Sequence, residues 1–261
     1  MNKISTLILA AGKGSRLMPY TKNWPKCLMP IGNYPLLEYW LSLLNENKIC
    51  DVYINLHSHH KVVEKFLKRK RFKNMIKTIY EEDLLGTAGT LFYIKDKFKF
   101  NTILIVHADN WSVFNLGDFI DYHLYHRPKG SYATMMTFDS DNPQQTGIVE
   151  TDSNGIITNF YEKISNPPSN RANAAVYLLE REAFDLFKNE KDITDFSTQV
   201  IPKLLGNIST WHNNHIHKDI GTIETLRKAQ KDIKPKIVWQ EIDDWYIKFQ
   251  KNPIHQLIER N

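Results

Sequence analysis

Short apolar runs alternate with segments of helical periodicity through the first half of the 261-residue chain. Ile4–Leu9 is an apolar run of the kind found in strands buried on both faces, whereas Leu36–Asn47 carries a helical apolar stripe. The expected strands are Ile4–Leu9, Asp51–Leu56, Ile76–Tyr80 and Thr102–Val106, and the expected helices are Leu36–Asn47, His60–Lys70, Thr87–Lys97 and Leu116–His126. This order predicts an α/β fold with a Rossmann-like, mostly parallel, twisted sheet and helices on both faces.

The second half follows a different pattern. Gly147–Thr151 and Ile156–Glu162 flank an Asn-Gly pair, which predicts a small antiparallel hairpin. Further strands are expected at Tyr132–Phe138 and Asn173–Leu179, helices at Asp195–Leu205 and Gly221–Lys231, and a last helical region after Pro235. We expect one catalytic domain over residues 1–232 and a helical extension over 233–261, packed on the same domain.

Composition excludes several classes of protein. Hydrophobic residues make up 42% of the chain, enough for a core, and two cysteines exclude a disulfide scaffold. No apolar run approaches 18 residues, and the apolar N-terminal stretch is short and lacks a cleavage site, so we expect a cytoplasmic protein with no membrane partner. The run of lysines and arginines between Lys61 and Lys73 contains no glycine and is typical of a solvated helix end, so no nucleic-acid partner is expected.

A glycine-rich turn, Ala10-Ala11-Gly12-Lys13-Gly14-Ser15-Arg16, follows the first strand. Such turns cradle phosphates through backbone N–H groups, although a plain tight turn would look similar. Leu17 stands where a dinucleotide fingerprint needs a third glycine, and the Walker spacing is absent. Arg16 and Lys26 supply two cations that could neutralise a triphosphate.

Two aspartates follow predicted strands or precede predicted helices. Asp109 comes just after Thr102–Val106, and Asp219 precedes the helix at Gly221–Lys231. Together with bound phosphates, two such oxygen ligands would suit Mg²⁺, but either residue could instead cap a helix. Two histidine clusters, His57/His59/His60 and His212/His215/His217, lie in expected loops and fit no helical ligand pair, so zinc is disfavoured.

The motifs, taken in order, resemble those of the sugar-1-phosphate nucleotidyltransferases. The resemblance runs from residue 4 to about 230 and is carried by Leu9–Leu17, Pro25-Lys26, Pro30–Gly32, Pro35–Glu38, Leu85–Gly89, Gly147–Glu150, Tyr161–Lys163, Ala172–Ala175, Asp195–Ser197 and Asp219–Thr222. The chain departs from the pattern at His107-Ala108, where the family usually has Gly or Asn before the Asp. No hexapeptide β-helix repeat follows residue 232, and the helical tail is expected to be a docking or dimer element.

The resemblance implies a reaction and a set of roles. A sugar 1-phosphate attacks the α-phosphorus of a nucleoside triphosphate, giving an NDP-sugar and pyrophosphate. The implied catalytic residues are Arg16, Lys26 and Asp109, with Asp109 and Asp219 holding Mg²⁺. Ala10, Ala11, Gly12, Gly14, Ser15, Arg16, Gly86 and Thr87 would bind the nucleotide, although Thr87 could be a helix cap. Lys26, Gly147, Glu162, Lys163 and Asn173 would bind the sugar phosphate.

The substrates are harder to assign. The motifs look most like those of mannose-1-phosphate guanylyltransferases without a β-helix domain, which favours GTP with mannose 1-phosphate or a related hexose or heptose phosphate. A uridylyl-, thymidylyl- or cytidylyltransferase and a catalytically silent regulatory relative are the alternatives. Retention of Arg16, Lys26, Asp109, Lys163 and Asp219 speaks against the silent relative.

Overall fold

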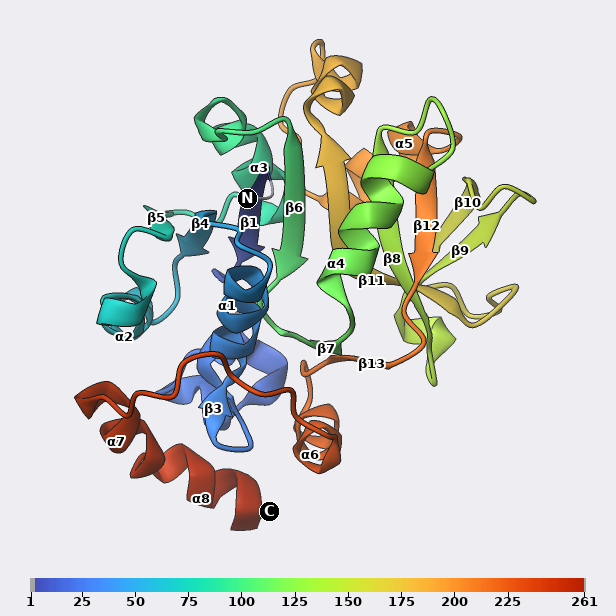
Figure 1. The fold of residues 1–261 in the computed structure, drawn as a ribbon. Helices are drawn as coiled ribbons and strands as arrows, with labels where there is room; N and C mark the ends of the chain where they lie inside the picture. The colour runs from blue at the N-terminus through green and yellow to red at the C-terminus, as the bar shows by residue number, and fades with distance from the viewer. Residues whose placement is uncertain (1–2, 261) are drawn as a thin grey trace.

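The computed structural model describes residues 3–260 and centres on a nine-stranded mixed sheet (Figure 1). Its first half consists of β1 (Ile4–Leu9), β4 (Asp51–Leu56), β5 (Ile76–Tyr80) and β6 (Thr102–His107). These four strands pair in parallel in the order β6-β1-β4-β5. The prediction of a Rossmann-like parallel sheet is therefore confirmed.

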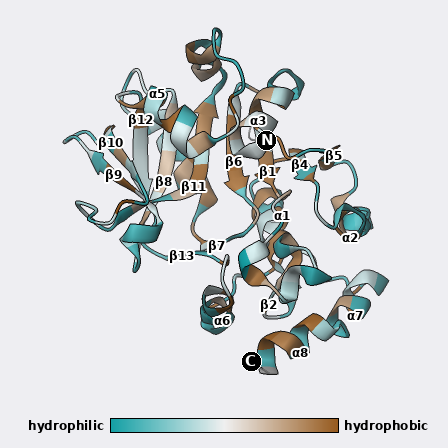
Figure 2. Ribbon diagram, turned by 180° about the vertical axis from the view of Figure 1, so that it is seen from behind, coloured by the Kyte–Doolittle hydropathy of each residue, from teal (hydrophilic) through white to brown (hydrophobic). Residues whose placement is uncertain are grey.

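Helices cover both faces of this sheet, as the sequence predicts. The helices of the first half are α1 (Leu36–Glu46), α2 (His60–Leu67), α3 (Gly86–Ile94) and α4 (Leu116–Asp121). In β1, Ile4 and Ile8 pack in the core shared with α1, α2 and α4, whereas Leu7 packs in the core shared with α3. This alternation explains why β1 is apolar on both faces, and Figure 2 shows β1 and β6 as largely hydrophobic ribbons.

The second half extends the sheet with antiparallel pairs. It contributes β8 (Ala133–Asp139), β9 (Gly147–Thr151), β10 (Ile157–Glu162), β11 (Arg171–Glu180) and β12 (Ile208–His212). β11 joins the two halves, because it pairs antiparallel with β6, β8 and β9. The predicted hairpin of β9 and β10 is present, and Gly155 takes φ 79° in its turn.

The sequence missed five short strands. Besides β12, these are β7 (Asn110–Val113) and β13 (Ile216–Asp219), which form a separate two-stranded antiparallel sheet, and the pair β2 (Pro30–Ile31) and β3 (Tyr34–Pro35). The expected helix at Asp195–Leu205 is a π-helical turn, Phe196–Val200, followed by α5 (Ile201–Leu204). Asp195 caps this turn through its side chain, which accepts from the Thr198 N–H.

The C-terminal segment consists of α6 (Ile223–Lys231), α7 (Asp244–Gln250) and α8 (Pro253–Arg260). Ile237, Ile254 and Ile258 belong to the same hydrophobic cluster as β1 and α1. Phe249 of α7 is 1% exposed and stacks between Trp24 and Trp245, at ring-centroid distances of 6.0 and 5.1 Å. Within residues 3–260, no helix is long and apolar enough to cross a membrane.

Candidate active site

A pocket of about 250 Å³ opens at the carboxyl ends of β1, β4 and β6. This is the edge of a parallel sheet at which α/β proteins bind ligands. Of the residues expected to bind substrate or metal, it brings together Ala10, Ala11, Gly12, Lys26, Gly86, Thr87 and Asp109. The structure places Gly14, Ser15, Arg16 and Asp219 outside this lining, on the Lys26 side.

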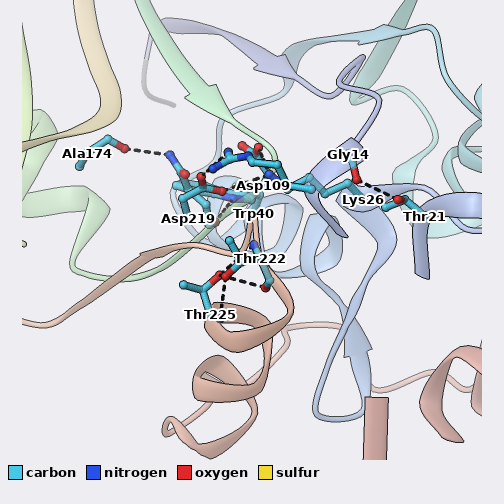
Figure 3. Close-up of polar contacts among 11 residues, drawn as sticks. Gly14, Thr21, Lys26, Trp40, Asp109, Ala174, Asp219, Thr222 and Thr225 are labelled. Carbon is cyan, nitrogen blue, oxygen red and sulfur yellow. Dashed lines mark hydrogen bonds and ion pairs between the residues drawn. The ribbon is translucent and has the colours of Figure 1, made fainter. Parts of the chain in front are cut away.

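Four charged side chains form a cluster beside the pocket (Figure 3). The Lys26 ammonium donates to Asp109 Oδ2 and, at 3.1 Å, to Asp219 Oδ1. Arg16 Nη2 donates to Asp219 Oδ2 at 3.2 Å. The Lys26 side chain is only 9% exposed, whereas that of Arg16 is 68% exposed. Lys26 is therefore a fixed buried cation, and Arg16 reaches solvent, where it can meet a ligand.

The cluster keeps Lys26 and Asp109 ionised. Burial by itself lowers the pKa of Lys26, but the charges of Asp109 and Asp219 outweigh burial and raise this pKa above its usual value. Burial likewise opposes ionisation of Asp109, yet Lys26 and then His107 hold the pKa of Asp109 below its ordinary range. Burial also lowers the pKa of His107, so this pocket-lining ring is neutral near pH 7.

Strand pairing brings the two aspartates together. β13 pairs with β7 so that Asp219 lies opposite Asn110, and the Ile220 N–H donates to the Asp109 carbonyl at 3.1 Å. Asn110 is itself anchored, because its Nδ2 donates to the Ala174 carbonyl at 2.8 Å. Trp40 Nε1 donates to the Asn110 carbonyl at 2.9 Å. Hydrogen bonds with β11 and α1 thus hold Asn110 in place, next to Asp109 and opposite Asp219 (Figure 3).

Neither aspartate caps a helix, so that alternative is wrong. Asp109 lies between β6 and β7, and Asp219 is the last residue of β13. Helix α6 is instead capped by Thr222, which forms a capping box with Thr225 (Figure 3). Both carboxylates are therefore available to the charged cluster.

Two glycines permit close packing around the cluster. A Cβ on Gly221 would lie 2.8 Å from both Arg16 Nη2 and Asp219 Oδ2. Gly14 takes φ 65°, and a Cβ there would lie 2.8 Å from the Thr21 methyl group and 3.2 Å from Lys26 Cβ. Any larger residue at either position would displace the charged groups.

The start of α3, at Gly86 and Thr87, is fixed by its contact with the segment before α5. Gly86 takes φ 83°, and a Cβ there would lie 2.3 Å from the Thr194 carbonyl oxygen. Thr87 lines the pocket, but its hydroxyl accepts from the Phe196 N–H at 2.8 Å. Thr87 lies inside α3, which begins at Gly86, and gives it no side-chain cap, so the reading of Thr87 as a helix cap is wrong.

The expected sugar-phosphate residues lie at the open end of β9–β11. Lys163 Nζ contacts Glu162 Oε1 at 2.9 Å, and Lys163 takes φ 51°. Asn173 donates to the Tyr177 hydroxyl at 2.7 Å and accepts from the Ala175 N–H at 2.8 Å. A Cβ on Gly147 would lie 2.5 Å from the Phe160 ring, so packing alone requires this glycine. None of these residues lines the 250 Å³ pocket.

Comparison with known proteins decides the family. The family model described as "Nucleotidyl transferase" matches residues 5–236. The chain belongs to this family. The chain is 26% identical over 237 residues to the mannose-1-phosphate guanylyltransferase of Mycobacterium tuberculosis, covering 89% of this chain and 65% of that protein.

Other relatives agree with this assignment. The chain is 30% identical over 252 residues to the bifunctional protein GlmU of Methanococcus aeolicus, covering 90% of this chain and 57% of GlmU. The chain therefore spans about three fifths of the length of these curated relatives. The crystal structure of HddC from Yersinia pseudotuberculosis has the same fold, with a TM-score of 0.73 at 20% identity and coverage of 87% and 98% of the two chains.

Two polar residues of the 250 Å³ pocket were missed by sequence reasoning. Asn55 Oδ1 accepts from the Ala10 N–H at 2.6 Å, and Asn55 Nδ2 donates to Glu81 Oε1 at 2.9 Å. Glu81 also accepts from the Thr90 hydroxyl at 2.5 Å and from the Leu85 N–H at 3.2 Å. Both residues lie at or just past the carboxyl ends of predicted strands, β4 and β5, and that position was the available signal.

The histidines expected in a second loop cluster lie largely in strands, so that expectation was wrong. His212 ends β12 and His217 is in β13. His217 Nδ1 lies 2.7 Å from the Ser112 hydroxyl, and His212 Nδ1 lies 3.2 Å from the Thr137 hydroxyl. Over residues 3–260, no three His, Cys, Asp or Glu side chains are grouped to hold a metal by themselves.

Proposed function

We propose that the protein transfers a nucleotidyl group from a nucleoside triphosphate to a sugar 1-phosphate. An oxygen of the sugar phosphate attacks the α-phosphorus, and the bond from that phosphorus to the bridging oxygen of the β-phosphate breaks. The products are an NDP-sugar and pyrophosphate. The observation that carries the proposal is the Lys26–Asp109–Asp219–Arg16 cluster beside a pocket at the end of β1.

Each cation has a separate part in this proposal. Lys26, held by two carboxylates, lies where the glycine-rich turn meets the pocket and would neutralise charge on the α-phosphate and the incoming sugar phosphate. Arg16 is exposed and would turn toward the β- and γ-phosphates, where its planar fork can hold the departing pyrophosphate. No protein nucleophile is needed, because positioning and charge neutralisation suffice.

The charge balance of the cluster favours a divalent cation. Two cations and two carboxylates sum to zero, so the cluster alone cannot neutralise a triphosphate and a sugar phosphate. Asp109 and Asp219 present oxygens to one shared ammonium, and two carboxylates beside substrate phosphates are the ligand type that Mg²⁺ prefers. These residues would hold Mg²⁺, which when bound supplies positive charge to the reacting phosphates.

The pocket wall supports guanine as the base. Three donors converge on the Glu81 carboxylate, which lines the pocket as an acceptor-only group when ionised. Guanine presents two adjacent donors, N1–H and the N2 amino group, whereas uracil and thymine present one donor between two acceptors. A carboxylate therefore favours guanine and opposes the two pyrimidines. The name of the mycobacterial relative also supports GTP.

The sugar-side groups support a hydroxyl-rich substrate. Glu162 and Lys163 form an exposed charge pair, and Asn173 lies on the neighbouring strand β11. A lysine beside a carboxylate and an amide can bind a phosphate and sugar hydroxyls together. We therefore propose mannose 1-phosphate or a related hexose or heptose 1-phosphate as the acceptor. The reaction would take place in the cytoplasm, as the sequence led us to expect.

A substrate matrix tests the proposal. GTP, UTP, dTTP and CTP are each combined with several hexose and heptose 1-phosphates and Mg²⁺, and released pyrophosphate is measured. We expect the fastest release with GTP and mannose 1-phosphate or a close analogue. Release with another nucleotide would replace the assignment of guanine, and no release in any mixture would favour the catalytically silent relative.

A substitution of Glu81 tests the proposal that the base is guanine. Glu81→Gln replaces one acceptor by a donor, so kcat/KM for GTP should fall about 10- to 100-fold relative to UTP. Glu82→Gln alters the exposed neighbouring residue and is the matched control. An unchanged GTP-to-UTP ratio in Glu81→Gln would contradict the role of this carboxylate.

A further inference from the structure

A second cleft, of about 600 Å³, lies away from the candidate active site. Its walls come from α6, from the turn between β2 and β3 at Gly32–Asn33, and from α7 and α8. Figures 1 and 2 agree that the C-terminal end of α8 comes to lie next to α6. The cleft and the 250 Å³ pocket share no lining residue.

Gln230 fixes the floor of this cleft. Its Oε1 accepts from the Gly32 N–H at 2.9 Å, and its Nε2 donates to the Pro30 carbonyl at 2.7 Å. On the opposite wall, Gln250 Nε2 donates to the Asn33 carbonyl at 2.7 Å. The turn is thus bound to α6 and to α7 at once, so the cleft is a built feature of the fold.

Two buried nitrogen atoms in the cleft lining have no hydrogen-bond partner among the described residues. Arg227 Nε and His255 Nε2 are buried nitrogens that make no hydrogen bond to any of residues 3–260. Arg227 and Lys231 lie one turn apart on α6, and neither forms an ion pair within the part of the chain that the structure describes. Folded proteins rarely leave buried nitrogens unpaired, so Arg227 Nε suits a ligand that supplies an acceptor, and His255 Nε2 suits a ligand that bonds to it as donor or acceptor.

The charges of the lining favour an anion. Arg227 and Lys231 contribute two positive charges, and Glu259 contributes one negative charge. His255 lies edge-on to Phe249 and adds a group that donates or accepts according to its tautomer. From this arrangement we infer that the cleft is a second binding site, for a small phosphate monoester, with Arg227 and Lys231 holding the phosphate and His255 bonded to a phosphate oxygen or a hydroxyl. The inference does not depend on the proposed nucleotidyl transfer.

The test uses the full chain and two probes, inorganic phosphate and glycerol 1-phosphate. Each is titrated while the ring ¹H and ¹³C signals of His255, assigned by comparison with His255→Asn, are followed by NMR. We expect saturable shifts of the His255 signals, and an increase of 10-fold or more in the dissociation constant in the double variant Arg227→Gln/Lys231→Gln.

Two controls separate this site from the active site and from general effects of charge. Lys228→Gln removes a lysine of the same helix that pairs with Glu224 and does not line the cleft, and it should leave the titration unchanged. Arg16→Ala should also leave the His255 titration unchanged. No shift of His255 with either probe, or equal affinity in the double variant with an unchanged unfolding midpoint, would overturn the inference.

Discussion

Lys26 Nζ lies 3.1 Å from Asp219 Oδ1, although 193 residues separate them in the chain. The contact joins the start of the turn Lys26–Leu28 to the end of β13. Asp219 reaches it only because β13 pairs with β7 beside Asp109. The candidate site is therefore assembled from three distant segments, and the predictions below follow from how they meet.

Removing a charge at the reacting phosphates should abolish pyrophosphate release and leave the fold intact. For Arg16→Ala and Asp109→Asn we expect a loss of at least about 100-fold in kcat, the size found when a stabilising donor is removed from a catalytic site. Pyrophosphate release and circular dichroism measure activity and fold. Lys22→Ala, an exposed lysine near the same turn, is the control. Near-normal turnover in either charge variant would contradict the assignment.

Gly221→Ala should disrupt the cluster by steric contact. The added Cβ would lie 2.8 Å from Arg16 Nη2 and Asp219 Oδ2, so one of these groups must move, and kcat/KM should fall. A double-mutant cycle identifies the cause. In the Arg16→Ala background the same substitution should cost less, because one of the two clashing groups is gone. Equal losses in both backgrounds would show that Arg16 is not the group displaced.

His217 should make stability depend on pH. Burial lowers its pKa to about 3. Below pH 6.5 the unfolded chain takes up a proton there that the folded protein binds only near pH 3, so acidification favours unfolding. We expect His217 to contribute a loss of up to about 1.4 kcal/mol in the free energy of unfolding per pH unit below 6.5.

Denaturant unfolding between pH 7 and 5 checks this effect. His217→Gln should flatten the dependence, whereas His215→Gln, at an exposed histidine just before β13, should not. The same slope in wild type and His217→Gln would show that other groups carry the acid sensitivity.

Phe249 should stabilise the whole chain, because it stacks on Trp24 just before Lys26 as well as on Trp245. Phe249→Ala should lower the free energy of unfolding by about 3–5 kcal/mol, the usual cost of deleting a buried aromatic ring. Tryptophan fluorescence and far-ultraviolet circular dichroism should report one shared transition. Ile247→Ala, at a half-exposed position of the same helix, should cost far less. A separate early transition for the tail would mean that it folds apart from the catalytic segment.

The sequence predicted the parallel strands well because β1, β4 and β6 are buried along nearly their whole length, and only the edge strand β5 is largely exposed. β1, β4, β5 and β6 are apolar or bounded by clear helical stripes, and their bounds differ from the structure by at most one residue. β7 and β13 could not be found in this way. They are four residues long, and β13 reads Ile-His-Lys-Asp, with no apolar alternation. Their pairing depends on tertiary contacts such as that of Trp40 with Asn110.

The candidate site likewise combines residues that the sequence could predict with contacts that it could not. The glycine-rich turn, Lys26 and Asp109 follow from local motifs and from the position of strand ends. The hydrogen bond from the Ala10 N–H to Asn55 joins residues 45 positions apart, and the contact of Arg16 with Asp219 joins residues 203 positions apart. No local pattern encodes such distances, because they arise when separate strands enter one sheet.

The most direct test of nucleotidyl transfer is product stoichiometry. The wild-type protein is incubated with GTP, mannose 1-phosphate and Mg²⁺, and ³¹P NMR follows every phosphorus species. We predict that each molecule of sugar 1-phosphate consumed yields one molecule of NDP-sugar and one of pyrophosphate. We also predict that release of pyrophosphate requires the sugar phosphate. Release of pyrophosphate or phosphate from GTP without consumption of the sugar phosphate would contradict the account.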